Sequence, residues 1–373
     1  MRNRKTLVLG TVLPFLTLLP CLRDNTARLD TPLSPVAEVD GHVFGMSVGG
    51  NTLYAGGAFI KAGDLTVNKI AKWDGKNWSA LDSGMEPSAA GVVTLAMMGT
   101  NLYVGGKFKT AGGVIVNNIA RWDGKKWLAL GSGMNNTVYS LAVSGTTLYA
   151  GGKFTSAGGV PANKIAKWDG ENWSVLGSGM DTPAIINDGP IALAVMGTAL
   201  YAAGWFTTAG GVTVNHIAKW DGTDWSALGS GLNATVYGLT VSGSAVYVAG
   251  DFTEAGDLTV NHIAKWDGTN WSALGSGMNA RTNAIAVIGS ALYVGGRFTT
   301  AGGARARYIA MWDGANWLPL GSGFNAPVNT LAVMGTKLYI GGMFTTAGGA
   351  EANYIAGWDG ARWSALGAGS QTD

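Results

Sequence analysis

The fold is decided by the stretch Asn261-His262-Ile263-Ala264-Lys265-Trp266-Asp267-Gly268-Thr269-Asn270-Trp271-Ser272-Ala273-Leu274-Gly275, because close copies of it recur along the 373-residue chain. The first tryptophan of this stretch has seven counterparts in total, which are Trp73, Trp122, Trp168, Trp220, Trp266, Trp312 and Trp358. The intervals between them are 49, 46, 52, 46, 46 and 46 residues, and a second tryptophan follows each one five residues later. The chain is therefore a tandem array of seven units.

Each unit contains four short apolar runs with the composition of β-strands. In the third unit they cover residues 138–143, 148–154, 165–168 and 173–176. They are rich in Val, Leu, Tyr and Trp and are bounded by Gly, Asn, Asp or Ser, as expected of strands separated by turns. A repeat of about 40 to 50 residues with four strands is typical of a propeller blade. The sequence therefore predicts an all-β fold, a seven-bladed β-propeller with four antiparallel strands per blade.

The Asp-Gly between the two tryptophans of each unit predicts a tight turn between the third and fourth strands, because Asp bonds to its own backbone and Gly accepts a positive φ. The aspartates of these turns are Asp74, Asp123, Asp169, Asp221, Asp267, Asp313 and Asp359. The flanking tryptophans would face each other across the ladder, where an aromatic pair adds roughly 0.5–1.5 kcal/mol beyond burial. We interpret both sets as structural repeat residues rather than as an acid/base set or a ligand platform.

A double glycine ends the second strand of several units, as at Gly105-Gly106 and Gly151-Gly152. Glycine weakens a strand unless another part of the chain comes close. We expect another backbone to approach here, where neighbouring blades pack near a central channel.

A resemblance to a known family is visible in these residues. The apolar run Leu148 to Gly152, followed by Trp168-Asp169, Trp173 and Leu176, resembles the kelch repeat. The fuller form, with Gly-Gly-x-Phe-Thr, Ala-Gly-Gly, Asn-x-Ile-Ala and Leu-Gly-Ser-Gly-Met, is similar to the repeats of fungal cortical cell-polarity marker proteins and related bacterial exported repeat proteins, over roughly residues 41–370. Trp stands where kelch units most often have Tyr before Asp. The resemblance implies a propeller but indicates little about activity, because kelch-like propellers host scaffolds, lectin-like modules and a few oxidases.

The N-terminal residues 1–30 lie outside the repeat and are interpreted as a signal peptide or an N-terminal anchor. Residues 1–5 are basic, and the apolar run 6–19 is too short for a comfortable membrane span. Cleavage is the main interpretation, with lipid attachment at Cys21 or an uncleaved anchor as alternatives. We expect a secreted, periplasmic or cell-surface protein that meets a membrane only through this segment.

A Pro-containing lead-in at 31–41 precedes the propeller, which is assigned to 42–373 with blades of about 46–52 residues. Both ends of the array are in the same phase, so the ring is expected to close without a shared blade. Residues 36–39 could add a strand against an edge.

Composition excludes several classes of function. The formal charge is +2 without a basic stripe, so no nucleic acid partner is expected. The chain has one cysteine, Cys21, which removes Cys-rich zinc sites. His216 and His262 share a template position, but no carboxylate recurs beside both, so no metal or cofactor is expected. A Ser/His/Asp set or a phosphate loop is not visible.

Positions at which the copies differ are the candidates for ligand binding. The residue after the double glycine varies most, and it is Ala58, Lys107, Lys153, Trp205, Asp251, Arg297 or Met343. This mixed ring near the channel mouth would suit a polar ligand, with Trp205 as a stacking platform. A solvated rim is the alternative interpretation.

Two units are longer than the rest, by insertions at 86–91 and 181–190 between the fourth strand of one blade and the first of the next. In an antiparallel meander these connections emerge on the same face as the loops between second and third strands. We call it the long-loop face and expect binding there, although tolerated drift would also explain the insertions. In the sixth unit Arg305 and Arg307 form a pair that suits a carboxylate or phosphate, or are surface charges.

These patterns favour an exported, non-catalytic binding or interaction propeller that recognises a protein partner or a surface glycan. The candidate ligand-binding residues are Lys107, Lys153, Trp205, Asp251, Arg297, Asp181, Asp188 and Arg307. One alternative is a carbohydrate-active enzyme that uses non-repeated residues such as Asp181, Asp188, Arg281 and Arg307. Another is a structural repeat module without a ligand. The oligomeric state is left open.

Overall fold

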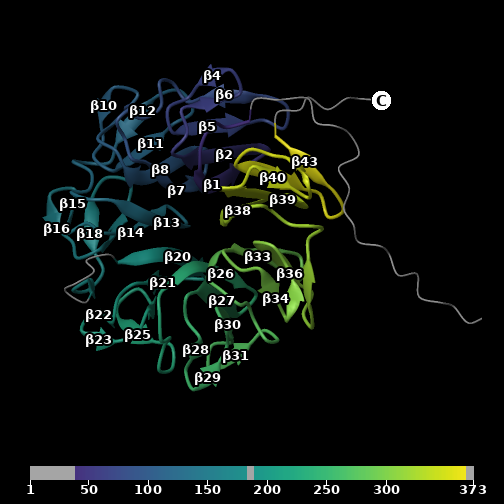
Figure 1. Ribbon diagram of the computed structural model, residues 1–373. Helices are drawn as coiled ribbons and strands as arrows, with labels where there is room; N and C mark the ends of the chain where they lie inside the picture. Colours follow the sequence, from purple (N-terminus) through teal and green to yellow (C-terminus); the bar gives the residue numbers. More distant parts are fainter. Residues whose placement is uncertain (1–37, 183–188, 367–373) are drawn as a thin grey trace, which may run out of the picture.

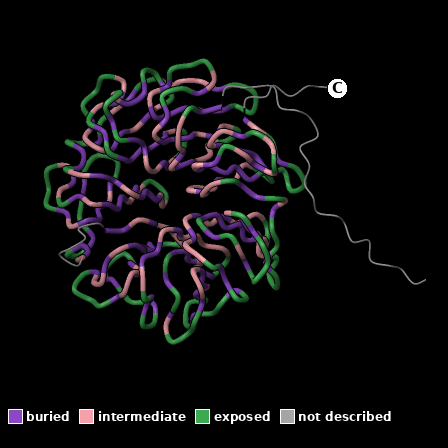
Figure 2. Tube along the Cα trace, in the orientation of Figure 1, coloured by how far each residue is buried: buried purple, intermediate pink, exposed green. Residues whose placement is uncertain are grey.

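The computed structural model describes residues 38–182 and 189–366 and shows seven four-stranded antiparallel sheets arranged as a closed ring (Figure 1). Blade one contains β1 (Val43–Gly49), β2 (Thr52–Gly57), β5 (Ile70–Trp73) and β6 (Trp78–Ala80), paired in that order. The first strand of every blade lies nearest the centre of the ring, and exposed residues gather at the periphery (Figure 2). The predicted all-β seven-bladed β-propeller is therefore confirmed.

The other six blades repeat this order. They consist of β7 (Gly91–Met98), β8 (Asn101–Lys107), β11 (Ile119–Trp122) and β12 (Trp127–Ala129); β13 (Val138–Ser144), β14 (Thr147–Gly152), β17 (Ile165–Trp168) and β18 (Trp173–Val175); β20 (Pro190–Met196), β21 (Ala199–Gly204), β24 (Ile217–Trp220) and β25 (Trp225–Ala227); β26 (Val236–Ser242), β27 (Ala245–Gly250), β30 (Ile263–Trp266) and β31 (Trp271–Ala273); β32 (Thr282–Ile288), β33 (Ala291–Gly296), β36 (Ile309–Trp312) and β37 (Trp317–Pro319); and β38 (Val328–Met334), β39 (Lys337–Gly342), β42 (Ile355–Trp358) and β43 (Trp363–Ala365). In the described part of the chain, no helix is long and apolar enough to cross a membrane.

Each blade also carries a small hairpin between its second and third strands, which the sequence did not predict. The hairpins are β3 (Lys61–Ala62) with β4 (Leu65–Thr66), β9 (Thr110–Ala111) with β10 (Val114–Ile115), β15 (Ser156–Ala157) with β16 (Val160–Pro161), β22 (Thr208–Ala209) with β23 (Val212–Thr213), β28 (Glu254–Ala255) with β29 (Leu258–Thr259), β34 (Thr300–Ala301) with β35 (Ala304–Arg305), and β40 (Thr346–Ala347) with β41 (Ala350–Glu351). The connector that leaves the preceding blade bridges to this hairpin, as Met85 does to Ala111; in blade four it forms β19 (Met180–Asp181). Connectors and hairpins therefore share one face, as expected for the long-loop face.

Ring closure uses the lead-in. Val39 bridges to Ala62 and so takes the place that a connector from the preceding blade occupies elsewhere. The Trp78 indole nitrogen donates to the Leu366 carbonyl, 3.4 Å away, and joins the first blade to the last. Each blade is one continuous segment, so the ring closes without a shared blade, and the end of the lead-in belongs to the ring.

The tryptophan pairs clamp the outer strands, as the sequence predicts. Trp168 and Trp173 are paired across β17 and β18, with ring centroids 5.3 Å apart, and both are buried. Trp173 Nε1 also donates to the Leu130 carbonyl of the preceding blade, at 2.9 Å. Four further blades make the equivalent bond to the blade before them, from Trp127, Trp225, Trp271 and Trp317. The second tryptophan therefore joins blades as well as strands.

The turn between these tryptophans is also as predicted. The Asp169 carboxylate accepts hydrogen bonds from the backbone nitrogens of Asn172, at 2.7 Å, and Glu171, at 2.9 Å. These bonds hold the pKa of Asp169 below its ordinary value. The same two bonds occur at all seven turn aspartates, which explains their repetition without any chemistry.

The double glycines leave no room for a Cβ, as expected, but the nearest atoms of the neighbouring blade belong to a side chain and not to its backbone. A Cβ on Gly57 would lie 2.0 Å from the His42 carbonyl oxygen, which is backbone of the same blade. A Cβ on Gly56 would lie 2.3 Å from Cγ1 of Val92 in the next blade. The first glycine thus accommodates a neighbouring side chain, and only the second faces a backbone.

Candidate functional site

The first strands of all seven blades line the central channel, which encloses about 230 Å³. Each of these strands has a β-bulge near its start; in β1, Val43 pairs with Gly57 and Gly45 with Gly56, which leaves Phe44 over. A bulge can turn a side chain toward a site. The extra residues, here called the bulge ring, are Phe44, Val93, Tyr139, Ile191, Tyr237, Asn283 and Asn329, and all of them line the channel.

The residues after the double glycines surround the same end of the channel. Lys153 N donates to the Thr137 carbonyl and Asp251 N to that of Thr235, both at 2.9 Å, immediately before the inner strands begin. Trp205 N and Arg297 N make the equivalent bonds, and Lys107 O accepts one from Ala90 N. Together with the bulge ring they form the channel mouth, on the long-loop face. The structure therefore places these five predicted residues at the channel mouth.

Positive charge is concentrated at this mouth. The cationic side chains that the structure describes at these positions or directly against them are Lys69, Lys107, Lys153, Lys164, Arg281 and Arg297. Among the same described positions, Asp251 supplies the one carboxylate. Lys69 and Lys164 are buried, so Lys107, Lys153, Arg281 and Arg297 supply the accessible positive charge of the mouth. Such a concentration favours anionic ligands.

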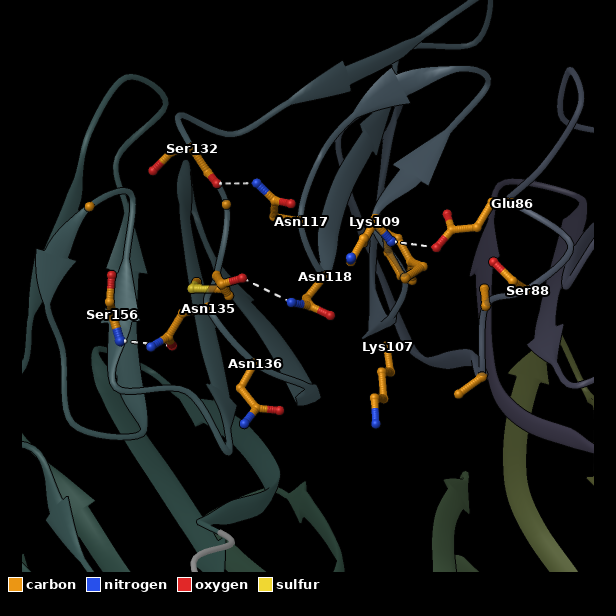
Figure 3. A pocket seen from close by; sticks show the side chains of 16 residues that line it. Glu86, Ser88, Lys107, Lys109, Asn117, Asn118, Ser132, Asn135, Asn136 and Ser156 are labelled. Atoms are coloured by element: carbon orange, nitrogen blue, oxygen red, sulfur yellow. Dashed lines mark hydrogen bonds between the residues drawn. The ribbon is translucent and has the colours of Figure 1, made fainter.

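A groove of about 720 Å³ lies between blades two and three on the long-loop face (Figure 3). It is bordered by the inserted segment that starts at Glu86, by Lys107 and Lys109, and by the amides of Asn118 and Asn136. An adjoining hollow of about 430 Å³ shares Lys107 and Asn136 with the groove. We call the two together the blade-two/three groove.

The inner hollow joins this groove to the channel. Lys153 lines the hollow, and so do Val93 and Tyr139 of the bulge ring. The same two bulge residues line the channel. The groove and the channel mouth therefore form one connected surface.

The groove presents both hydrogen-bond donors and acceptors. Its lysines offer ammonium groups, whereas Asn118 already donates through Nδ2 to the Met134 carbonyl and offers its amide oxygen. Burial acts to raise the pKa of Glu86, but hydrogen bonds from Lys109 N, at 2.7 Å, and Thr110 N, at 2.6 Å, outweigh it and hold the pKa below the ordinary value. This carboxylate is thus already occupied. Asn136 Oδ1 accepts from Thr137 N, which leaves its amide nitrogen as a donor near the Lys107 ammonium group.

Asp181, another sequence candidate, lies away from the channel mouth. Asp181 accepts hydrogen bonds from Asn163 Nδ2, at 3.0 Å, and Thr208 Oγ1, at 3.2 Å. It occupies the connector position at which Asn135 binds the next hairpin, so its contacts hold blades together. Asp188 falls outside the described residues.

The sixth-unit arginines also lie apart from the mouth. Arg305 and Arg307 line a separate hollow of about 200 Å³ with Gly321 and Ser322. The contacts of Asp181, Arg281 and Arg307 are made with three different sets of residues, so no shared cluster of them is formed.

His216 and His262, which share a template position, contact the backbone just before the mouth residues Trp205 and Asp251. Their Nδ1 atoms lie 3.1 Å from Gly204 O for His216 and 3.2 Å from Gly250 O for His262. Burial lowers the pKa of His216. Trp205 meets the His216 ring edge-on at 6.1 Å, and its buried Nε1 has no hydrogen-bond partner among the described residues.

Sequence reasoning missed the bulge ring and the amides of the groove. The bulge position varies between aromatic, aliphatic and amide side chains, whereas a Leu, Ile or Met follows two residues later in every unit, and this contrast could have identified it. Asn136 stands where the connectors of three other units have Ala234, Ala280 and Ala326, so the same kind of contrast could have identified it.

Comparisons with known proteins identify the fold and no family. No protein-family model and no curated protein matches the sequence. Among solved structures, the chain is similar to the computationally designed Ika8 protein, with 16% identity and a TM-score of 0.51 over 88% of this chain and 86% of that one. It is also similar to a chain of the mitotic checkpoint complex, with 13% identity and a TM-score of 0.52 over 91% and 96%.

A third similar structure is the extracellular domain of a protein named as a hybrid two-component system from B. thetaiotaomicron. The identity is 12% and the TM-score 0.54, over 84% of this chain and 38% of that one. At such identities the likeness concerns the fold alone. The resemblance to kelch and cell-polarity marker repeats stays an expectation.

Proposed function

We propose that this protein is an exported, non-catalytic binding propeller whose long-loop face recognises a carboxylate-bearing surface glycan. The observation that carries the proposal is the blade-two/three groove, where ammonium donors and side-chain amides surround an open volume. Its one described carboxylate, Glu86, already accepts hydrogen bonds from the protein backbone.

The size and chemistry of the groove support a saccharide. A volume of about 720 Å³ lies within the range of about 300–1,000 Å³ that small-ligand sites occupy. Side-chain amides both donate to and accept from hydroxyl groups, and Lys107 and Lys153 add charge for a carboxylate. The groove also continues to the basic channel mouth, which gives an extended chain room to follow.

A binding role fits this groove better than glycoside hydrolysis. That reaction generally needs two carboxyl groups that flank the bond, about 5 to 9.5 Å apart. The described lining residues provide only Glu86, which is committed to Lys109 N and Thr110 N. A protein partner on the same face is the competing proposal, and the following experiment separates the two.

The test is calorimetric titration of the full chain with a uronic-acid oligosaccharide and with its neutral counterpart. We expect the acidic oligosaccharide to bind, and Lys107→Ala and Asn136→Ala each to weaken it about 3- to 10-fold, as for the loss of one charged or polar hydrogen bond. Lys125→Ala removes the same charge from an exposed turn that does not line the groove, and serves as the matched control. Equal losses in all three variants, or no binding of the acidic oligosaccharide, would reject the proposal and direct the search to protein partners.

A further inference from the structure

The boundary between blades five and six carries a polar network that has no counterpart among the described residues of the other blades. Arg281 precedes the inner strand of blade six, and the residues at the equivalent position in the other blades are His42, Gly91, Thr137, Gly189, Thr235 and Pro327. An arginine therefore enters the channel mouth at one place only among these seven positions. It breaks the symmetry of the repeat at the mouth.

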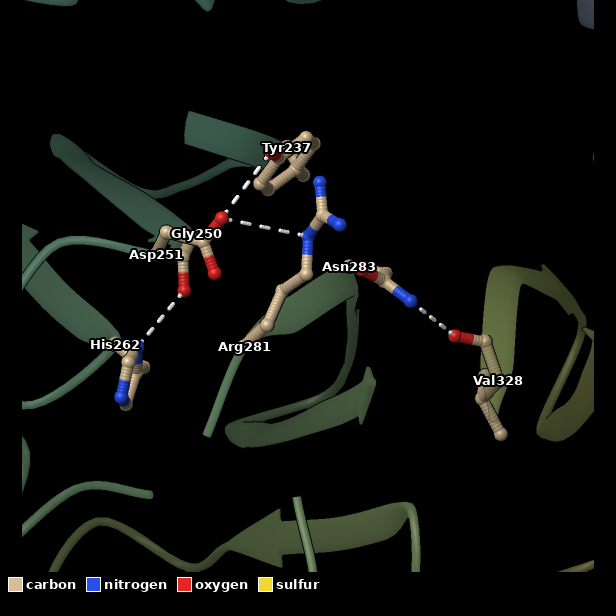
Figure 4. A network of polar contacts seen from close by, with 7 residues as sticks. All are labelled: Tyr237, Gly250, Asp251, His262, Arg281, Asn283 and Val328. Carbon is tan, nitrogen blue, oxygen red and sulfur yellow. Dashed lines mark hydrogen bonds and ion pairs between the residues drawn. The ribbon is translucent and has the colours of Figure 1, made fainter. Parts of the chain in front are cut away.

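The Arg281 side chain is held from two sides (Figure 4). Its guanidinium carbon lies 3.4 Å from the centre of the Tyr237 ring, which is a close cation–π contact. Its Nε lies 3.7 Å from Asp251 Oδ2, and the same oxygen accepts a hydrogen bond from the Tyr237 hydroxyl at 3.2 Å. Burial raises the pKa of Tyr237, so the hydroxyl stays protonated and keeps donating.

These contacts leave the functional end of Arg281 free. The side chain is only 28% exposed, yet no described residue accepts a hydrogen bond from its two terminal nitrogens, which point away from Asp251 in Figure 4. The buried Nε also lacks a hydrogen-bond partner. A guanidinium fork matches a carboxylate with two parallel hydrogen bonds. Because the fork is already fixed, binding costs less side-chain entropy than it would for a mobile arginine.

The surroundings favour one negative charge and a neighbouring hydroxyl. Arg297 starts beside Arg281, since its backbone nitrogen donates to the Arg281 carbonyl at 2.8 Å, and Asp251 balances only one of these two cations. Asn283 of the bulge ring donates through Nδ2 to Val328 O at 2.8 Å. This bond fixes the amide and leaves its oxygen as an acceptor for a hydroxyl group.

We propose that Arg281 anchors a second binding site at the channel mouth, which takes a single carboxylate of a hydroxylated acid such as a sugar acid. The Arg281 fork binds the carboxylate, Tyr237 and Asp251 position the fork, and Arg297 supplies the excess charge. The site goes beyond the proposed function because none of its residues lines the blade-two/three groove. It needs no metal and no chemical step.

The test is a titration of the full chain with D-glucuronate, with glucose as the neutral comparison, followed by protein NMR or calorimetry. We expect saturable binding of glucuronate, a loss of at least 10-fold in affinity for Arg281→Ala, and a loss of about 5-fold for Arg281→Lys, which keeps the charge and removes the fork. Lys125→Ala, in an exposed turn that lines neither the groove nor the channel, should change the affinity less than 2-fold and serves as the control.

Several results would overturn the proposal. An unchanged affinity of Arg281→Lys for glucuronate would overturn it, and this result can be obtained even if Arg281→Ala does not fold. It would also be overturned by an equal loss in Lys125→Ala, which would make the effect one of overall charge, or by tighter binding of inorganic phosphate than of glucuronate, which would assign a tetrahedral anion. Failure of the unaltered chain to bind glucuronate would reject this site, while the oligosaccharide experiment would still decide on the groove.

Discussion

The outer strands of each blade and the channel mouth follow opposite rules. At the outer strands, the tryptophan pair repeats in every blade, and the second tryptophan donates through Nε1 to the preceding blade in six of the seven blades. Trp363 Nε1 in the last blade is the exception, without a partner among the described residues. At the mouth the residues differ from blade to blade, and buried polar atoms such as Trp205 Nε1 and Arg281 Nε have no partner in the described chain. A buried polar atom without a partner costs free energy. The comparison indicates that the outer half of the blade serves stability, whereas the mouth bears that cost for another purpose.

The largest effect is expected from Trp173→Ala. The substitution removes a buried side chain, its aromatic pair with Trp168 and the hydrogen bond to Leu130 of the preceding blade. We expect the free energy of unfolding to fall by about 3–5 kcal/mol, measured by chemical denaturation. A loss below 1 kcal/mol would show that the outer pair is not what holds adjacent blades, and the division into two regions would fail.

The second prediction concerns the seam, the place where the lead-in residues Glu38 and Val39 meet the first and last blades. Here too a buried polar atom lacks a partner among the described residues, and its protonation is expected to affect the free energy of unfolding. Glu38 is buried there, its carboxylate accepts a hydrogen bond from Asn353 N, and Oε1 lacks a partner in the described part of the chain. Burial raises the pKa of Glu38 to about 8 from its ordinary 4.5. The folded state therefore binds a proton that the unfolded chain releases above pH 4.5, so this contribution is complete below pH 4.5 and is lost as the pH rises to 8.

Melting curves from pH 5 to pH 8 check this expectation. We expect the unaltered chain to lose about 1–3 kcal/mol of stability over this range relative to Glu38→Gln, which has no proton to release. Taking the difference between the two proteins removes the contributions of other titrating groups, such as His216, whose pKa is lowered and whose effect has the opposite sign. Parallel curves would show that the seam does not depend on the Glu38 proton.

The smallest effect is expected from Trp205→Phe at the mouth. The change keeps an aromatic ring against His216 and removes the Nε1 donor that has no partner. We expect the free energy of unfolding to change by less than about 1 kcal/mol, upward if at all, in the same denaturation experiment. A loss above 2 kcal/mol would make Trp205 part of the blade core and remove the contrast with Trp173.

The sequence predicts the repeated part of this molecule well and the singular part poorly. Seven copies of the Trp-Asp-Gly turn identify strands, turns and blade number, because the same local physics acts at each copy. The small hairpins were missed because two-residue strands have no hydrophobic period. In the structure each hairpin is also bridged by a residue of the preceding connector, such as Met85, or of the lead-in. Variation after the double glycine correctly located Lys107 and Asp251 at the mouth.

The partners of those residues could not be predicted in the same way. The contact between Tyr237 and Arg281 joins two blades, and sequence spacing does not reveal which side chains meet across a blade boundary. Asp181 was proposed as a ligand-binding residue for its place in an insertion. It instead occupies the shared connector position, where it binds Thr208 and Asn163, so an alignment of connector residues would have suggested a structural role.

The bridge from each connector to the next hairpin has a consequence for how such a chain can grow. The repeat seen in the sequence is not a self-contained structural unit. Met134, in the connector that follows blade two, bridges to Ala157 in the hairpin of blade three. An isolated copy would therefore leave both its connector and its hairpin unpaired. A duplication that adds one copy adds one matching connector and one matching hairpin, so the number of blades can change while every junction keeps its geometry. Only the junction between Val39 and Ala62 would not be copied, because it is made by the lead-in and not by a connector of the repeat.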